Sequence, residues 1–302
     1  MAGKTRNKNY TFDFFVVEQG ERTDLFSTDI ASYLMQIVSK ESSAQYTAHG
    51  CTREIYGLKY RENSRSFTGQ IRKHRKAELP EIGTIGSVGK PMILGDDEGV
   101  IEKNFFIFHI DNSLLILHRN EQANSAIHFT QLISLSSGRK CISSPIINPD
   151  DAKLILKNKI PVKKIKVKMH RPKNAGLYPP DAGSLESAIL EVMNAAGADT
   201  IDISLGIDSK LPDSRPGLLD SVKSALSYLI TVGATHATID ADENGKIHPI
   251  DLIANRIYSV QSEKTNTSYP SDSDMYNLAD KAFSDKQEVV REYFGAESNR
   301  IK

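Results

Sequence analysis

The chain of 302 residues has little cysteine, and its few thiols carry no recognisable chemistry. Cys51 and Cys141 lie far apart and show no paired spacing. Their number excludes a disulfide framework and a cysteine-rich zinc site, and it indicates a reducing compartment. Neither thiol has an identifiable base beside it in the sequence, so no cysteine nucleophile is predicted.

Long hydrophobic runs are also absent. The apolar runs at residues 105–110 and 114–117 are far shorter than the roughly 20 residues that span a bilayer. No apolar segment follows the basic residues at the N-terminus, so no secretory signal is predicted. We therefore expect a cytoplasmic protein without a membrane span. With 39% hydrophobic residues the chain can bury a core, and its length favours about two domains.

No complete catalytic or metal-binding motif is present. Residues 83–91 are similar to a phosphate-binding loop, but five residues separate the glycines and Pro91 replaces the expected Mg²⁺ ligand. Residues 240–245 match the first half of an EF-hand calcium loop, but the twelfth position is Asp251 and the flanks alternate like strands. A hairpin with an Asn-Gly turn explains these residues without a metal. The histidines show no metal-ligand spacing, so no cofactor and no metal are predicted.

One fragment keeps an enzymatic alternative open. Asp202, Asp208 and Lys210 lie at the end of a predicted strand. They have the residue types of a nuclease site, in which carboxylates hold Mg²⁺ and a lysine positions water. The D-x-K spacing is common by chance, and a polar loop explains it more simply. We therefore keep a Mg²⁺-dependent nuclease as an alternative and assign no catalytic residue.

The zero net charge hides an uneven distribution. Residues 1–173 carry 27 basic and 18 acidic side chains, whereas residues 174–302 carry 11 basic and 20 acidic ones. The two parts therefore have net charges of +9 and −9. Such asymmetry is a feature of proteins that contact nucleic acids or membrane surfaces.

The positive charge gathers in two stretches, at residues 53–76 and 153–173. A polyanion gains free energy at such surfaces because each phosphate contact releases condensed counterions. The alternative is that both stretches are solvated faces that keep the protein soluble. For nucleic-acid binding we select six residues from the first stretch and four from the second: Arg61, Arg65, Arg72, Lys73, Arg75, Lys76, Lys163, Lys164, Lys166 and Lys168.

The second stretch contains an unusual strand. Residues 162–169 read VKKIKVKM, and from Lys164 onward basic and apolar residues alternate strictly. Such a strand packs one face on a core and presents a row of lysines on the other, with about 6.6–7 Å between successive lysines. This repeat is close to the phosphate repeat along a nucleic-acid strand. An edge strand that its lysines protect from aggregation fits the pattern equally well.

Aromatic residues are interleaved with the first basic stretch. Tyr56, Tyr60 and Phe67 stand among its arginines and lysines, a mixture that suits stacking on exposed bases. The alternative, which we favour slightly, is that these rings belong to the core or pair with neighbours across strands.

The order of predicted elements indicates an α+β fold with two mixed α/β domains, each containing an antiparallel hairpin. One hairpin is predicted at residues 105–118, around Asp111-Asn112-Ser113, and another at residues 236–252. Residues 64–99 are basic and then rich in glycine, so we expect extended structure and long loops there. The predicted domains are a basic disordered tail at 1–9, an N-terminal α+β domain at 10–148, a C-terminal α+β domain at 149–260, and a polar linker with a C-terminal helix at 261–302.

Helices are predicted where apolar residues recur at helical spacing after a capping residue. The first begins at Ser27 or Thr28, and a later one is capped by Ser184. The others are predicted at residues 123–135, 150–157 and 216–232, and a last helix ends near residue 294. Further strands are predicted at residues 10–17, 55–60 and 200–205.

Several of these segments together resemble a known group of proteins. They are the central FFIFHIDNSLLILHR hairpin with the helix behind it, and the later segments SLESAILEVMNAAGADTIDISL and ATIDADENGKIHPIDL. In element order, over most of residues 10–260, the chain resembles the RexA phage exclusion proteins and loosely related proteins of bacterial anti-phage operons. The resemblance implies a homodimeric, cytoplasmic protein that binds double-stranded DNA without sequence preference and acts with a partner in abortive infection. It implies no catalytic residue.

We therefore expect a sequence-nonspecific double-stranded DNA-binding protein of an anti-phage system, with phosphate contacts from both basic stretches. Its expected partners are nucleic acid, a second copy of the chain and a second defence protein. Besides the nuclease, a non-enzymatic interaction partner in a toxin–antitoxin or defence pair is the alternative. The choice between DNA and RNA stays open.

Overall fold

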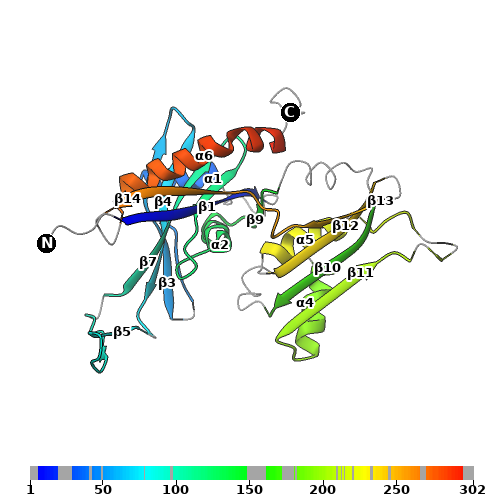
Figure 1. Cartoon of the computed structure of the whole chain (residues 1–302), viewed down its shortest axis with the longest axis horizontal. Helices are drawn as coiled ribbons and strands as arrows, with labels where there is room; N and C mark the ends of the chain where they lie inside the picture. Colours follow the sequence, from blue (N-terminus) through cyan, green and yellow to red (C-terminus); the bar gives the residue numbers. More distant parts are fainter. Residues whose placement is uncertain are drawn as a thin grey trace. The chain divides into compact units, whose positions relative to one another are not determined.

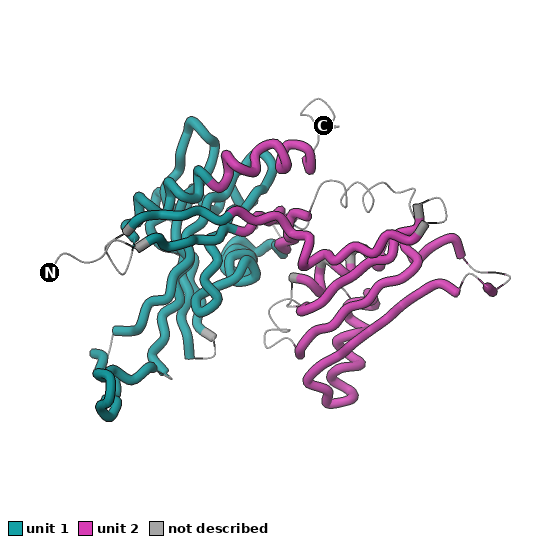
Figure 2. Tube along the Cα trace, in the orientation of Figure 1, with its two compact units in different colours: residues 1–12, 19–141, 260–281 teal, residues 13–18, 142–259, 282–302 magenta. Residues whose placement is uncertain are grey.

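The computed structural model of the chain contains two compact units that are interleaved along the sequence (Figure 2). Unit 1 comprises residues 1–12, 19–141 and 260–281, and unit 2 comprises residues 13–18, 142–259 and 282–302. The structure describes residues 6–19, 29–40, 43–48, 50–77, 79–95, 98–147, 161–171, 180, 182–208, 210–211, 213, 215–219, 221–231, 234–243, 246–265 and 270–294.

An eight-stranded sheet holds most of the strands, in the order β14-β1-β8-β7-β4-β3-β2, with β9 paired to β1 (Figure 1). Its strands are β1 (Arg6–Gln19), β2 (Gln45–Ala48), β3 (Cys51–Arg61), β4 (Ser66–Arg75), β7 (Val100–His109), β8 (Leu114–His118), β9 (Cys141–Pro145) and β14 (Tyr258–Thr265). A separate small hairpin is formed by β5 (Glu81–Ile82) and β6 (Lys90–Pro91). The helices are α1 (Ile30–Val38), α2 (Ala126–Ser137) and α6 (Asp272–Phe294).

The predicted central hairpin is confirmed as β7 and β8, which pair from Phe106 with Leu117 to His109 with Leu114. The run Phe105–Phe108 is buried on both faces of the sheet. Phe106 packs edge-on against Phe129 of α2 at 5.1 Å, and Phe105 packs edge-on against Tyr276 of α6 at 5.5 Å. Since helices cover both faces here, this strand is continuously apolar instead of alternating.

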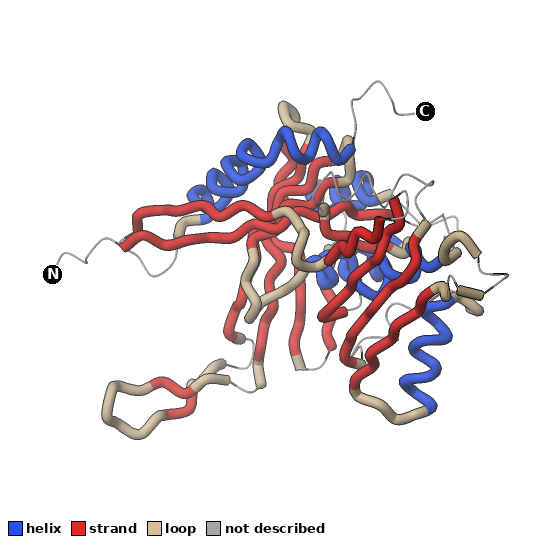
Figure 3. Tube along the Cα trace, turned by 45° about the vertical axis from the view of Figure 1, so that its right-hand side comes forward, coloured by secondary structure: helices blue, strands red, loops and turns tan. Residues whose placement is uncertain are grey.

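Unit 2 contains a second sheet of four antiparallel strands, in the order β11-β10-β12-β13. These are β10 (Val162–His170), β11 (Thr200–Gly206), β12 (Ala234–Glu243) and β13 (Lys246–Asp251). Helices α4 (Leu185–Ala195) and α5 (Ser221–Thr231) pack against one face, where Val167 and Ile239 are buried (Figure 3). Among the described residues of unit 2, no helix or strand covers the opposite face. The mixture of helices with antiparallel sheets in both units confirms the predicted α+β class.

Several expected boundaries are wrong. The predicted tail at 1–9 is shorter, because β1 already begins at Arg6 and residues 1–5 lie outside the described residues. The first helix is capped by Asp29, whose carboxylate accepts a hydrogen bond from the Ser32 backbone at 2.9 Å, and not by Ser27 or Thr28. The helix predicted to start at residue 216 begins at Ser221.

Strands β4 and β14 were not among the strands predicted from the sequence. Residues 66–75, which lie in the segment 64–99 that was expected to hold extended structure and long loops, form the regular strand β4, which pairs with β3 and β7. The polar segment 261–302, expected to be a linker and a helix, also contributes β14, which pairs with β1. Residues 260–281 therefore belong to unit 1. The helix predicted at 150–157 lies outside the described residues.

Gly69 of β4 allows close packing in the core of unit 1. A Cβ atom at this position would lie 2.8 Å from the Phe106 ring, which is itself fully buried and pressed against Phe129. We expect Gly69→Ala to destabilise the protein by about 1–3 kcal/mol through overpacking, measured as a lower midpoint of urea unfolding.

Gly206→Ala is the matched control, since a Cβ there would make only ordinary contact, 3.5 Å from Lys164. An equal loss of stability in both variants would contradict this account of Gly69.

Candidate nucleic-acid interface

The first basic stretch lies on β3, β4 and the turn between them, where successive side chains point to opposite faces of the sheet. Arg72 stacks over the Tyr56 ring on one face, with its guanidinium carbon 3.2 Å from the ring centre. Its neighbour Lys73 lies on the other face, where its amine donates to Glu102 and to the Gln122 carbonyl, both at 2.7 Å. The strand period thus separates these cations instead of gathering them into one patch.

Four of the six cations selected from this stretch are also paired with carboxylates. Arg61 makes two 2.9 Å hydrogen bonds to Asp280 of α6, and Arg65 lies 3.0 Å from Asp111. Arg75 shares Glu102 with Lys73, at 3.1 Å. Phosphate binding here would have to compete with these partners. Lys76, just beyond β4, is exposed.

The interleaved aromatic rings have structural partners. Phe67 is fully buried, and its ring centre lies 5.1 Å from that of Tyr60 on the paired strand. Tyr56 is 47% exposed, but one of its faces is covered by Arg72. This agrees with the favoured interpretation, in which these rings are core or cross-strand partners.

The second stretch forms the predicted row of lysines. Lys166 and Lys168 are exposed on β10 and Lys164 is half-buried, while Ile165 and Val167 between them are buried. The alternation is therefore confirmed. The edge-strand alternative is wrong, because β10 is paired on both sides, with β11 and with β12.

The cross-strand neighbours of these lysines are polar. Lys168 lies opposite Asp202 and Lys164 opposite Asp240, whereas Lys166 lies between Ser204 and Thr238. Within the part of the chain that the structure describes, Lys164, Lys166 and Lys168 make no ion pair. We call these three residues the lysine row.

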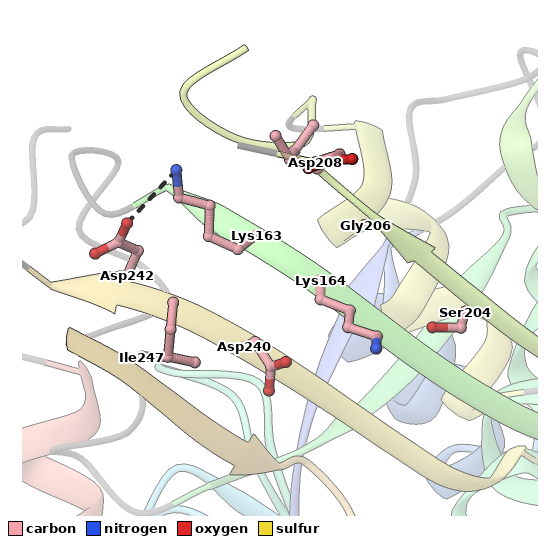
Figure 4. Close-up of a pocket in the computed structure, with 9 residues that line it drawn as sticks. Lys163, Lys164, Ser204, Gly206, Asp208, Asp240, Asp242 and Ile247 are labelled. Atoms are coloured by element: carbon pink, nitrogen blue, oxygen red, sulfur yellow. Dashed lines mark ion pairs between the residues drawn. The ribbon is translucent and has the colours of Figure 1, made fainter. Parts of the chain in front are cut away.

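Lys163 lies outside this row because of a β-bulge. From Val162 to Lys164 strand β10 advances by two residues, whereas its partner β12 advances by only one, from Ala241 to Asp240. Val162 and Ile165 both remain buried, which leaves Lys163 and Lys164 together on the open side. Lys163 then forms an ion pair with Asp242 at 3.5 Å (Figure 4).

The bulge borders a hollow of about 770 Å³ on the open face of the sheet. Its lining combines lysines, carboxylates and a hydroxyl: Lys163, Lys164, Ser204, Gly206, Ile207, Asp208, Asp240, Asp242 and Ile247. Ser204 was not a candidate in the sequence, and Asp240 was considered only as part of a calcium loop. The signal that could have indicated the hollow is the doubled lysine at 163–164, which interrupts the alternation.

The three nuclease candidates do not form one site. Asp202 and Asp208 are separated by six residues along β11 and its extension, roughly 20 Å at the rise of a strand, which is too far to share one ion. The Asp208 carboxylate accepts a 3.0 Å hydrogen bond from the Lys210 backbone, as in a polar turn. Among the described residues no group of three metal-ligating side chains comes together.

The hairpin histidines are structural. His118 packs against the rings of Phe12 and Phe105, and burial lowers the pKa of His109. Burial, together with the charges of Arg53 and Lys73, also lowers the pKa of His128 to about 3. The imidazoles of His109 and His128 are therefore held neutral at physiological pH.

The fold and this surface define an α+β protein with a mixed-charge, open antiparallel sheet face. The chain belongs to a family of unknown function (DUF6731), whose model matches residues 5–286. No match was found among curated proteins. The family description assigns no activity, so the resemblance to phage exclusion proteins stays a prediction. No helix within the described ranges is long and apolar enough to cross a membrane.

The two thiols should differ in reactivity. Burial raises the pKa of Cys141 to about 12, and its side chain is fully buried, whereas Cys51 is partly exposed. Only the thiolate is nucleophilic, so we expect a disulfide reagent at pH 8 to titrate Cys51 alone in the folded protein and both residues in guanidinium. Fast reaction of Cys141 in folded Cys51→Ser protein would contradict this expectation.

Proposed function

We propose that the protein binds double-stranded DNA without sequence preference through the lysine row on the open face of unit 2. The observation that carries the proposal is the contrast between the two basic stretches. Four of the six cations selected from the first stretch form ion pairs with carboxylates, whereas the three lysines of the row make no ion pair with any described residue.

The chemistry of this face favours phosphate contact over base recognition. The four strands of the sheet contain no phenylalanine, tyrosine or tryptophan. Stacking of bases on these three kinds of ring, which is a main contribution to the binding of single strands, is therefore not available from these strands. Lysine binds a phosphate as a point charge and carries little sequence information, which suits a duplex contacted along its backbone.

A row of three lysines makes few phosphate contacts, so binding by one copy would be weak. We therefore propose a homodimer, in which two rows contact the same duplex. As the sequence resemblance implies, we place this activity in anti-phage defence, with a second protein as partner. A plaque assay with cells that carry or lack the gene tests that setting independently of DNA binding.

Salt dependence tests the phosphate contacts. Three contacts predict a slope of about −2.7 per protomer in a plot of log K against log salt. We expect Lys166→Ala with Lys168→Ala to reduce the steepness by about 2 per protomer and to weaken binding to unrelated duplexes equally, in fluorescence anisotropy titrations.

The matched control removes the same charge from the first stretch. Arg65→Ala with Lys76→Ala also loses two exposed cations, and we expect little change in affinity or slope. Loss of binding in the control alone, or no binding of any duplex at low salt, would overturn the proposal.

A further inference from the structure

The hollow beside the bulge has the size and the polarity of a small-molecule site. Its volume of about 770 Å³ lies within the range of typical ligand pockets, roughly 300–1,000 Å³. It exists because β11 carries Gly206 directly opposite Lys164, so no side chain fills the space between Lys164 and Asp208. The backbone of Ile207 continues the pairing to the Lys163 carbonyl at 2.8 Å, which fixes Asp208 beside the bulge.

The charges around the hollow do not cancel. Lys163 and Asp242 are paired with each other. Lys164, Asp208 and Asp240 remain, and the structure shows no ion pair for these three within the described residues. They present one positive and two negative groups: Lys164 lies on the central strand, Asp240 is opposite it on β12, and Asp208 lies two residues beyond its β11 partner Gly206. Figure 4 shows Lys164 projecting between Ser204 and Asp240.

This arrangement of one positive and two negative groups favours one class of ligand. A phosphate would be repelled by the two remaining carboxylates, and a simple diamine would leave Lys164 without a partner. A free basic amino acid carries the complementary set of one carboxylate and two cationic groups. Charge-assisted hydrogen bonds of this kind are among the strongest in proteins, which favours a ligand that satisfies all three groups.

We propose that this hollow binds a free basic amino acid, with the ligand carboxylate on Lys164 and Ser204, its α-ammonium group on Asp240 and its side-chain cation on Asp208. The aliphatic part of the ligand lies against Ile247, which is 52% exposed. The inference does not rest on DNA binding, although the two ligands would compete for Lys164.

Isothermal titration calorimetry with L-lysine tests the site in the full-length protein. We expect L-lysine to bind, and two analogues to bind at least about tenfold more weakly. They are cadaverine, which lacks the carboxylate, and L-norleucine, which lacks the side-chain cation. Equal binding of cadaverine, or no binding of L-lysine at millimolar concentration, would overturn the proposal.

Variants separate the hollow from the rest of the face. We expect Lys164→Ala and Asp240→Asn each to lower the affinity for L-lysine about tenfold or more. Gly206→Leu should also abolish binding, because it fills the hollow without changing any charge. Circular dichroism would verify that each variant is folded.

The matched control is Lys168→Ala with Asp202→Asn. This pair has the same residue types, lies on adjacent strands of the same face, and does not line the hollow. We expect unchanged affinity for L-lysine. Equal loss in the control and in the Lys164 and Asp240 variants would show general surface electrostatics and would refute the site.

Discussion

The alternation of side chains along a β-strand is the constraint on which the surfaces of this protein depend. On β4 it sends the neighbours Arg72 and Lys73 to opposite faces of the sheet, so a dense run of positive charge forms no single patch. On β10 the same period places Lys164, Lys166 and Lys168 on one face and Ile165 and Val167 in the core. The spacing of charges, more than their number, therefore decides which basic stretch can meet a polyanion.

Some of the opposite charges of the two parts of the sequence form ion pairs with each other inside unit 1. Asp272 and Asp280 of α6 come from the acidic part, and they pair with Lys103 and Arg61 of the basic part. Asp272 also accepts a hydrogen bond from the buried Gln70. Opposite net charges in two parts of a sequence can thus reflect ion pairs within the protein as well as charged surfaces that are available to a partner. Only the structure distinguishes these two cases.

The elements that the sequence predicted well are those whose pattern is local. The β7–β8 hairpin is a continuous apolar run broken by a polar turn, and Ser113 takes the positive φ of 52° that such a turn accepts. Strand β4 was missed because Ser66, Thr68 and Gln70 are buried although they are polar, which removes the apolar signal. Their burial depends on long-range contacts, such as the one between Gln70 and α6, that no local pattern reveals.

The same limit applies to the candidate site. Alternation in residues 164–169 was sufficient to predict the lysine row, but not whether β10 lies at an edge or in the centre of its sheet, since pairing with β11 and β12 is non-local. Nor could the sequence show that Gly206 stands opposite Lys164 and so leaves a hollow there.

The residues on the paired strands give the lysines of the row different electrostatic surroundings. Lys166, between Ser204 and Thr238, has only neutral cross-strand partners and is best suited to a phosphate. Lys164, opposite Asp240 and beside the hollow, has a carboxylate within reach and is better suited to a ligand that also carries positive charge. Because carboxylates at both ends of the row repel phosphates, the face would bind a duplex weakly and reversibly. In the two proposals one strand thus serves two kinds of ligand, and the charges on the adjacent strands decide which lysine contacts which ligand.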